Sequence, residues 1–150
     1  MDTAPELTTL PAGPAIAVRD QVAMVELPAF FRAAFRDLSA CGGAQQAGPP
    51  FAIYHLLDGP RIDVEAVMPL RAPVAPTGHV HALELTGGPA VQVRHVGPYR
   101  ELGPAYEAID DWIEAHARAR AGGFREVYLT GPAVGSTEQI TLVVQPLTTN

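Results

Sequence analysis

The chain has 150 residues, of which 47% are hydrophobic and 17% are charged, a balance that supports one packed domain and excludes a disordered chain. The formal net charge of −6 argues against a general nucleic-acid-binding surface and favours the attraction of cations. All ten basic residues are arginine, so lysine Schiff-base chemistry and a phosphate-binding lysine are excluded.

Cysteine content and the first residues bear on the compartment in which the chain works. Cys41 is the single cysteine, which excludes an intrachain disulfide and favours a reducing compartment. The first residues lack the basic and apolar regions of a signal peptide, and no apolar run approaches the ~18 residues that a membrane helix requires. We therefore expect a cytoplasmic chain with no membrane partner.

In the first half of the chain, residue periodicity predicts a strand, a helix and two further strands, at 15–19, 28–38, 51–57 and 62–68. The helix is expected to place Phe31, Ala34, Phe35 and Leu38 on one face. Gly42 and Gly43 follow it and are expected to mark its end.

The second half predicts a two-strand hairpin, a helix and two closing strands, at 80–85, 90–95, 104–118, 124–130 and 139–145. The inner face of this helix is expected to carry Tyr106, Ile109, Trp112, Ile113 and His116. By analogy with the first half, it is expected to end at the glycine pair 122–123.

The two halves are similar in sequence. Leu10–Arg19 and Leu85–Arg94 are identical at six of ten positions, at an offset of 75 residues (85 − 10). Tyr54 aligns with Tyr128 at an offset of 74 (128 − 54), and 67–70 aligns with 144–147 at an offset of 77 (144 − 67). We therefore expect a single domain, 1–150, made of two copies of one unit at about 8–70 and about 80–148.

Two units with this order of elements predict an α+β fold. We expect a duplicated β-α-β-β module with an antiparallel-rich sheet, two helices on one side and a pseudo-twofold axis. Because interfaces between similar halves often hold a pocket, a ligand groove is expected where the two copies meet.

The strand expected at 124–130 carries an unusual residue. Alternation places Phe124, Glu126 and Tyr128 on one face. A carboxylate between two aromatic side chains is costly to bury unless it is paired, so an internal arginine partner (Arg100 or Arg125) and a ligand are both open explanations.

The repeat favours the ligand. When Tyr54 is aligned with Tyr128, Ala52 falls at the position of Glu126. A carboxylate that the fold required would be expected in both copies, and it occurs in one.

Short motifs in the second half resemble those of the GyrI-like effector-binding family. They are 93–99 with the order His-x-Gly-Pro-Tyr, a helix containing Tyr106 and Trp112, and 126–129 before a closing strand. The resemblance covers about residues 8–148 and implies a pair of β-α-β-β modules, as in the ligand-binding domains of AraC-type and MerR-type multidrug-responsive regulators and in stand-alone gyrase-inhibitory proteins. It places the ligand carboxylate on Glu126.

The first hypothesis is a stand-alone domain that binds hydrophobic, cationic or electrophilic small molecules. A partly buried carboxylate ringed by aromatic side chains suits a lipophilic cation, because attraction strengthens at low dielectric and ring faces add cation–π contact. The candidates around Glu126 are Tyr54, Tyr128, Trp112, Tyr99, Phe35 and Tyr106. Tyr54 and Tyr128 are preferred, since Phe35, Tyr106 and Trp112 also suit core positions on the helices.

The second hypothesis, which the resemblance implies, is a cofactor-free hydrolase of strained cyclopropanoid electrophiles. Glu126 would orient or deprotonate water, and Tyr54 or Tyr128 would protonate the leaving carbon. The third is a gyrase-inhibitory protein. No DNA-binding segment is expected in the few residues before the first strand, so direct nucleic-acid contact is not expected, and a homodimer or a separate regulatory protein stays open.

The remaining polar residues predict neither a cofactor nor a metal site. His79 and His81 share a strand face without a third ligand near them in the sequence. His95 is interpreted as a hydrogen-bonding residue at a strand end. Glu65 is interpreted as a solvated strand residue, or as a second anion if it faces the groove.

Overall fold

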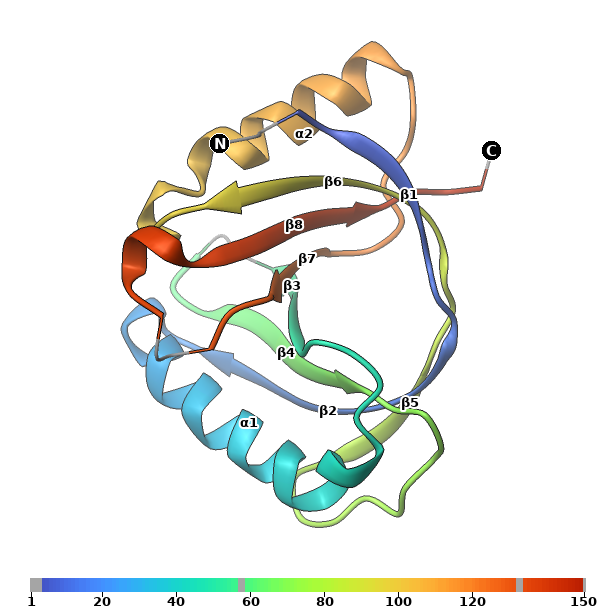
Figure 1. The fold of residues 1–150 in the computed structure, drawn as a ribbon, viewed down its shortest axis with the longest axis vertical. Coiled ribbons are helices and arrows are strands. Elements are labelled where there is room, and N and C mark those ends of the chain that lie inside the picture. The colour runs from blue at the N-terminus through green and yellow to red at the C-terminus, as the bar shows by residue number, and fades with distance from the viewer. Residues whose placement is uncertain (1–3, 57–58, 132–133, 150) are drawn as a thin grey trace. The chain divides into compact units, whose positions relative to one another are not determined.

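The structure is a computed structural model that describes residues 4–56, 59–131 and 134–149 (Figure 1). It divides into two compact units: unit 1 comprises Met1–Leu10 and Gly87–Asn150, and unit 2 comprises Pro11–Thr86. Within its described residues, each unit contains four antiparallel strands and one α-helix, which confirms the α+β class.

Unit 2 is a four-stranded sheet with one helix (Figure 1). Its elements are β2 (Gly13–Val22), the 3-10 turn η1 (Met24–Glu26), α1 (Leu27–Gly42), η2 (Gly43–Gln45), β3 (Phe51–Leu56), β4 (Ile62–Pro69) and β5 (His81–Leu85). The strand order is β3-β4-β2-β5. The long strand β2 pairs with β5 along 13–17 and with β4 along 15–22, so it ties the unit together.

The core of unit 2 lies between its sheet and α1. Ile16, Ala66 and Met68 from the strands pack with Ala34 and Leu38 from the helix. These helix residues belong to the face that periodicity predicted, since a stripe repeating every three to four residues is what a helix buries.

The helix α1 continues four residues beyond its predicted last residue, 38, and includes Gly42. A Cβ at Gly42 would lie 2.9 Å from Ile16 Cδ1 and 3.3 Å from Leu70 Cδ2. This glycine therefore serves close packing of the last helical turn against the sheet.

Unit 1 repeats the arrangement (Figure 1). Its elements are β1 (Glu6–Leu10), β6 (Gly88–Val96), η3 (Tyr99–Glu101), α2 (Gly103–Ala115), β7 (Phe124–Tyr128), η4 (Ser136–Glu138) and β8 (Ile140–Pro146). The strand order β7-β8-β6-β1 corresponds, strand by strand, to β3-β4-β2-β5 of unit 2. The strand β1 was not predicted from the sequence.

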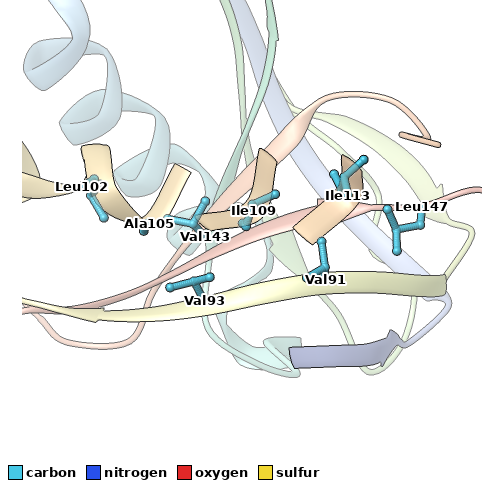
Figure 2. Close-up of a cluster of buried hydrophobic side chains, with 8 residues drawn as sticks. All are labelled: Val91, Val93, Leu102, Ala105, Ile109, Ile113, Val143 and Leu147. Carbon is cyan, nitrogen blue, oxygen red and sulfur yellow. The ribbon is translucent and has the colours of Figure 1, made fainter. Parts of the chain in front are cut away.

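The core of unit 1 is an apolar layer between α2 and the sheet (Figure 2). The helix contributes Ala105, Ile109 and Ile113, of which Ile109 and Ile113 were predicted for its inner face. They pack on strand and flanking residues, namely Leu102, Val91, Val93, Val143 and Leu147.

The predicted end of this helix is wrong. The helix α2 stops at Ala115, because Ala117 adopts a left-handed backbone (φ 51°) that no α-helix contains. His116 consequently lies on the surface and stacks on Trp112, with ring centroids 4.0 Å apart, instead of facing the core. Gly122, at φ 79°, belongs to the following loop.

The predicted hairpin of 80–85 and 90–95 is also wrong. The strand β5 pairs with β2, whereas β6 pairs with β1 and β8. The first strands of the two sequence copies are β1 and β5. Each pairs with the second strand of the other copy, β1 with β6 and β5 with β2. A two-residue Gly-Gly connection at 87–88 resembles a hairpin turn locally, so the sequence signal did not distinguish the two pairings.

We predict opposite stability effects for two adjacent glycines. Gly42→Ala is expected to lower the free energy of unfolding by about 1–3 kcal/mol, because its methyl group would overpack the buried Ile16 side chain. Gly43→Ala, whose Cβ would meet only Ser39 Cβ at 3.9 Å, is expected to be neutral or to stabilise by up to about 1 kcal/mol. Urea denaturation measures both, and equal effects would contradict the packing role of Gly42.

Candidate functional site

The strand β7 presents Glu126 to the helix-covered face of unit 1. Glu126 lies opposite Val143 of β8, which belongs to the core layer beneath α2. Because side chains alternate along a strand, Phe124 and Tyr128 share this face, as the sequence predicted. Glu126 is therefore a partly buried carboxylate at the edge of an apolar layer.

Both oxygens of the Glu126 carboxylate accept hydrogen bonds from tyrosine hydroxyl groups. The Tyr128 hydroxyl donates to Oε1 at 2.9 Å, and the Tyr106 hydroxyl donates to Oε2. Hydrogen bonds to an ionised group are about twice as strong as neutral ones, so two such donors fix the orientation of an ionised carboxylate.

Further aromatic rings pack against the two tyrosines that hold this carboxylate. The ring of Tyr99 meets that of Tyr128 edge-on, with centroids 5.8 Å apart, and Tyr106 meets Phe124 in the same way at 4.9 Å. The pKa of Tyr99 is raised above its usual value, first by partial burial and second by the negative charge of Glu126. Tyr99 keeps 46% of its surface exposed, so the cluster borders on solvent.

A tight turn delivers Tyr99 to the cluster. The strand β6 ends near Gly97, whose φ of 138° lies in the region that favours glycine. The His95 imidazole Nε2 lies 3.1 Å from the Pro98 carbonyl oxygen, which closes the turn before η3. The interpretation of His95 as a hydrogen-bonding residue at a strand end is confirmed.

Tyr106 has a larger part in the Glu126 cluster than the sequence analysis predicted. It follows the buried Ala105 on α2 and packs partly against the unit 1 core, as expected of a core residue. Its hydroxyl nevertheless reaches the Glu126 carboxylate. Its helical position, one turn before Ile109, could have predicted this role. A tyrosine at the boundary of the core can bury its ring while its hydroxyl group still makes a hydrogen bond.

The other predicted site residues lie elsewhere in their units. Trp112 packs partly against the unit 1 core and stacks on His116. In unit 2, Tyr54 is buried on β3, and Phe35 on α1 stacks on Phe31 with centroids 5.8 Å apart. Of the preferred pair, Tyr128 contacts Glu126, whereas the role of Tyr54 stays a prediction.

The interpretation of Glu65 as a solvated residue is wrong. Its exposed fraction is 5%, and its two carboxylate oxygens lie 2.9 Å from His55 Nε2 and 3.0 Å from His81 Nε2. The neighbouring Arg19 guanidinium donates two hydrogen bonds to Asp63, both 2.9 Å, and lowers the pKa of that carboxyl. Glu65 was not recognised because its histidine partners lie on two other strands.

Other potential site features are weaker. Among the described residues, no set of three or more His, Cys, Asp or Glu side chains is arranged to hold a metal ion. An open surface depression of about 560 Å³ in unit 2 is lined by Arg19, Asp20, Gln21, Arg61 and Asp63, which are polar and distinct from the predicted ligand-binding residues. Within the part of the chain that the structure covers, each helix is too short or too polar to cross a membrane.

Comparison with known proteins identifies the class as a small-molecule-binding domain. The family described as the GyrI-like small molecule binding domain matches residues 3–147, so the chain belongs to the GyrI-like family. No curated protein matches the chain at a comparable level.

Solved structures of low sequence identity share the fold. The EcmrR C-terminal domain has a TM-score of 0.85 at 20% identity, over 97% of this chain and 98% of that one. A structure described as a hydrolase from Listeria innocua has a TM-score of 0.75 at 16% identity, over 97% and 92%. The protein SAV2435 bound to tetraphenylphosphonium has a TM-score of 0.63 at 14% identity, over 96% and 93%.

We predict that Glu126→Gln lowers the pKa of Tyr99 without returning it to the usual value near 10, because the charge of Glu126 is the smaller of two causes and burial remains. A tyrosine whose folded pKa is raised loses its stabilising contribution as the pH rises above 10 through the folded pKa. Titration of tyrosinate absorbance, with Tyr99→Phe to assign the signal, measures the shift. An unchanged Tyr99 pKa would contradict the proximity of the two groups.

Proposed function

We propose that this chain binds hydrophobic cations, with Glu126 as the counter-charge. The observation that carries the proposal is the partly buried Glu126 carboxylate, held by two tyrosine hydroxyl groups at the edge of an aromatic cluster. Phenol donors are neutral, and a cation at Glu126 would add a charge–charge attraction to these hydrogen bonds.

The surroundings of Glu126 strengthen the attraction to a cation. At 4 Å, two unit charges attract by about 4 kcal/mol at an effective dielectric of 20, against about 1 kcal/mol in water. The faces of Tyr99, Tyr106 and Tyr128 add cation–π contact and apolar area. The net charge of −6 favours the approach of cations over that of anions.

Membership of a small-molecule-binding family supports this function, and one structure with the same fold was solved with tetraphenylphosphonium, a hydrophobic cation. The participation of Tyr54, Phe35 and Trp112 in ligand binding belongs to the proposal. So do a cytoplasmic location and an output through a homodimer or a separate regulatory protein.

We predict that Glu126→Gln weakens the binding of tetraphenylphosphonium at least about tenfold, since it keeps the side-chain volume and removes the charge. Isothermal titration calorimetry measures the dissociation constant. Glu114→Gln, an exposed position on α2, is the matched control because it removes the same charge from the surface of the same unit. Equal affinities for Glu126→Gln and the parent would exclude the carboxylate as the counter-charge.

A second candidate function is hydrolysis of strained cyclopropanoid electrophiles. The observation that favours it is the direct hydrogen bond between a potential acid, the Tyr128 hydroxyl, and a potential base, the Glu126 carboxylate. One structure with the same fold is described as a hydrolase.

The two groups support a balanced reaction. A water oxygen attacks a ring carbon while Glu126 takes the water proton, and the breaking C–C bond leaves its electron pair on a carbon that takes the proton of Tyr128. The Glu126 carboxyl then returns its proton to Tyr128 along their hydrogen bond. Both side chains regain their starting state without a cofactor.

If hydrolysis occurs, ring-opened product is expected to exceed one equivalent of protein when the chain is incubated with a cyclopropane-bearing alkylator. Tyr128→Phe is expected to reduce the turnover by about 10²-fold or more, because it removes the acid. Mass spectrometry measures the product. Saturable binding with no product above the buffer rate would leave binding as the function.

A further inference from the structure

We propose that the hydroxyl group of Thr141 is a second polar contact for the ligand at the Glu126 site. It would take a carbonyl, ether or amine group of a hydrophobic cation, and so select ligands that carry such a group near their charge. The inference rests on the proposed binding function.

Thr141 has an unsatisfied polar atom in the core of unit 1. Its side chain has 0% exposure, and its Oγ1 has no hydrogen-bond partner among the described residues. Gln145, on the same strand and 1% exposed, bonds instead to Arg120 and to the carbonyl oxygens of Gly122 and Pro146. An unpaired buried polar group destabilises a fold, so its presence in a native structure requires an explanation.

The position of Thr141 next to Tyr128 and Glu126 explains the unpaired hydroxyl group. It lies between Tyr128 of β7 and His95 of β6, on the face that carries Glu126. The bond from Leu129 N to Ile140 O, 3.1 Å, makes Tyr128 and Thr141 a non-hydrogen-bonded pair, whose side chains approach most closely in an antiparallel sheet. Glu126 and Val143 form the next pair on this face. The imidazole Nε2 of His95 is already engaged by Pro98.

The hydroxyl group of Thr141 has no counterpart in the other sequence copy. Tyr54 pairs with Val64 in unit 2 as Tyr128 pairs with Thr141 in unit 1, at the offsets of 74 and 77 found in the sequence. Val64 is fully buried, so the equivalent position accepts a residue of the same shape without a hydroxyl.

The same comparison holds for the neighbouring pair. Ala52 pairs with Ala66 where Glu126 pairs with Val143. A carboxylate and a hydroxyl thus distinguish the two copies at adjacent places on one face. Two polar departures from the repeat, side by side, point to one ligand that uses both.

Access to Thr141 requires movement of an aromatic side chain. Tyr128 is its closest cross-strand neighbour, and Tyr99 packs edge-on against Tyr128 while 46% of its own surface stays exposed. A ligand that displaces these two rings reaches the hydroxyl group and the Glu126 carboxylate together.

The test compares two cationic probes on the whole chain. Rhodamine 6G carries an ester and secondary amines, whereas tetraphenylphosphonium has neither nitrogen nor oxygen. Thr141→Val is expected to weaken rhodamine 6G binding about two- to tenfold more than tetraphenylphosphonium binding, the effect of one hydrogen bond. Thr141→Ser, which keeps the hydroxyl group, is expected to restore the preference. Fluorescence anisotropy and calorimetry give the dissociation constants.

Stability provides an independent readout. Thr141→Val is expected to raise the urea midpoint of unfolding, because it removes an unpaired polar group, whereas Val64→Thr in the equivalent position is expected to lower it. A lower midpoint for Thr141→Val would overturn the inference by showing that the hydroxyl group stabilises the fold. Equal losses for the two probes, or none, would also overturn it while leaving the Glu126 site intact. If the parent chain binds neither probe, the proposed function fails and the inference fails with it.

Discussion

Holding a charged carboxylate at the edge of an apolar layer is the constraint on which the candidate site depends. Glu126 would be costly to desolvate without partners, and two tyrosine hydroxyl groups supply them. These hydroxyl groups come from different elements, α2 and β7. The packing of α2 on the unit 1 sheet, through Ala105, Ile109 and Ile113, is therefore also what brings the Tyr106 hydroxyl to the carboxylate.

The duplication separates what the fold needs from what the site needs. Both units build the same strand order and bury an apolar helix face, yet unit 2 does so with Ala52 and Val64 where unit 1 has Glu126 and Thr141. Apolar residues therefore satisfy the framework at these positions. The unpaired hydroxyl group of Thr141 is expected to lower the stability of unit 1 relative to a valine at the same position.

Periodicity predicted those parts of the structure that depend on local patterning. Alternation along 124–128 placed Glu126 and Tyr128 on one face correctly, and helical spacing found Ile109 and Ile113. It failed where distant segments decide the result. The pairing of β5 with β2 instead of β6, and the burial of Glu65 by histidines from β3 and β5, depend on strand neighbours that spacing does not encode.

Local patterning also predicted part of the candidate site, the Glu126 carboxylate. The carboxylate was found because it breaks both an apolar pattern and an internal symmetry. Thr141 departs from the internal symmetry but not from the strand pattern, because threonine suits a strand as well as valine does. Only the absence of a hydrogen-bond partner for its hydroxyl group distinguishes it. The end of α2 was missed because a left-handed alanine at 117 carries no sequence signal.

The carboxylates of Glu65 and Glu126 have hydrogen-bond partners of different chemistry. Glu65 is held by the imidazole rings of His55 and His81. Glu126 is held by phenols, which donate hydrogen bonds while remaining neutral. The hydroxyl groups at Glu126 can reorient without moving a proton to solvent. In the proposed function, a ligand would exchange with these phenol donors at Glu126.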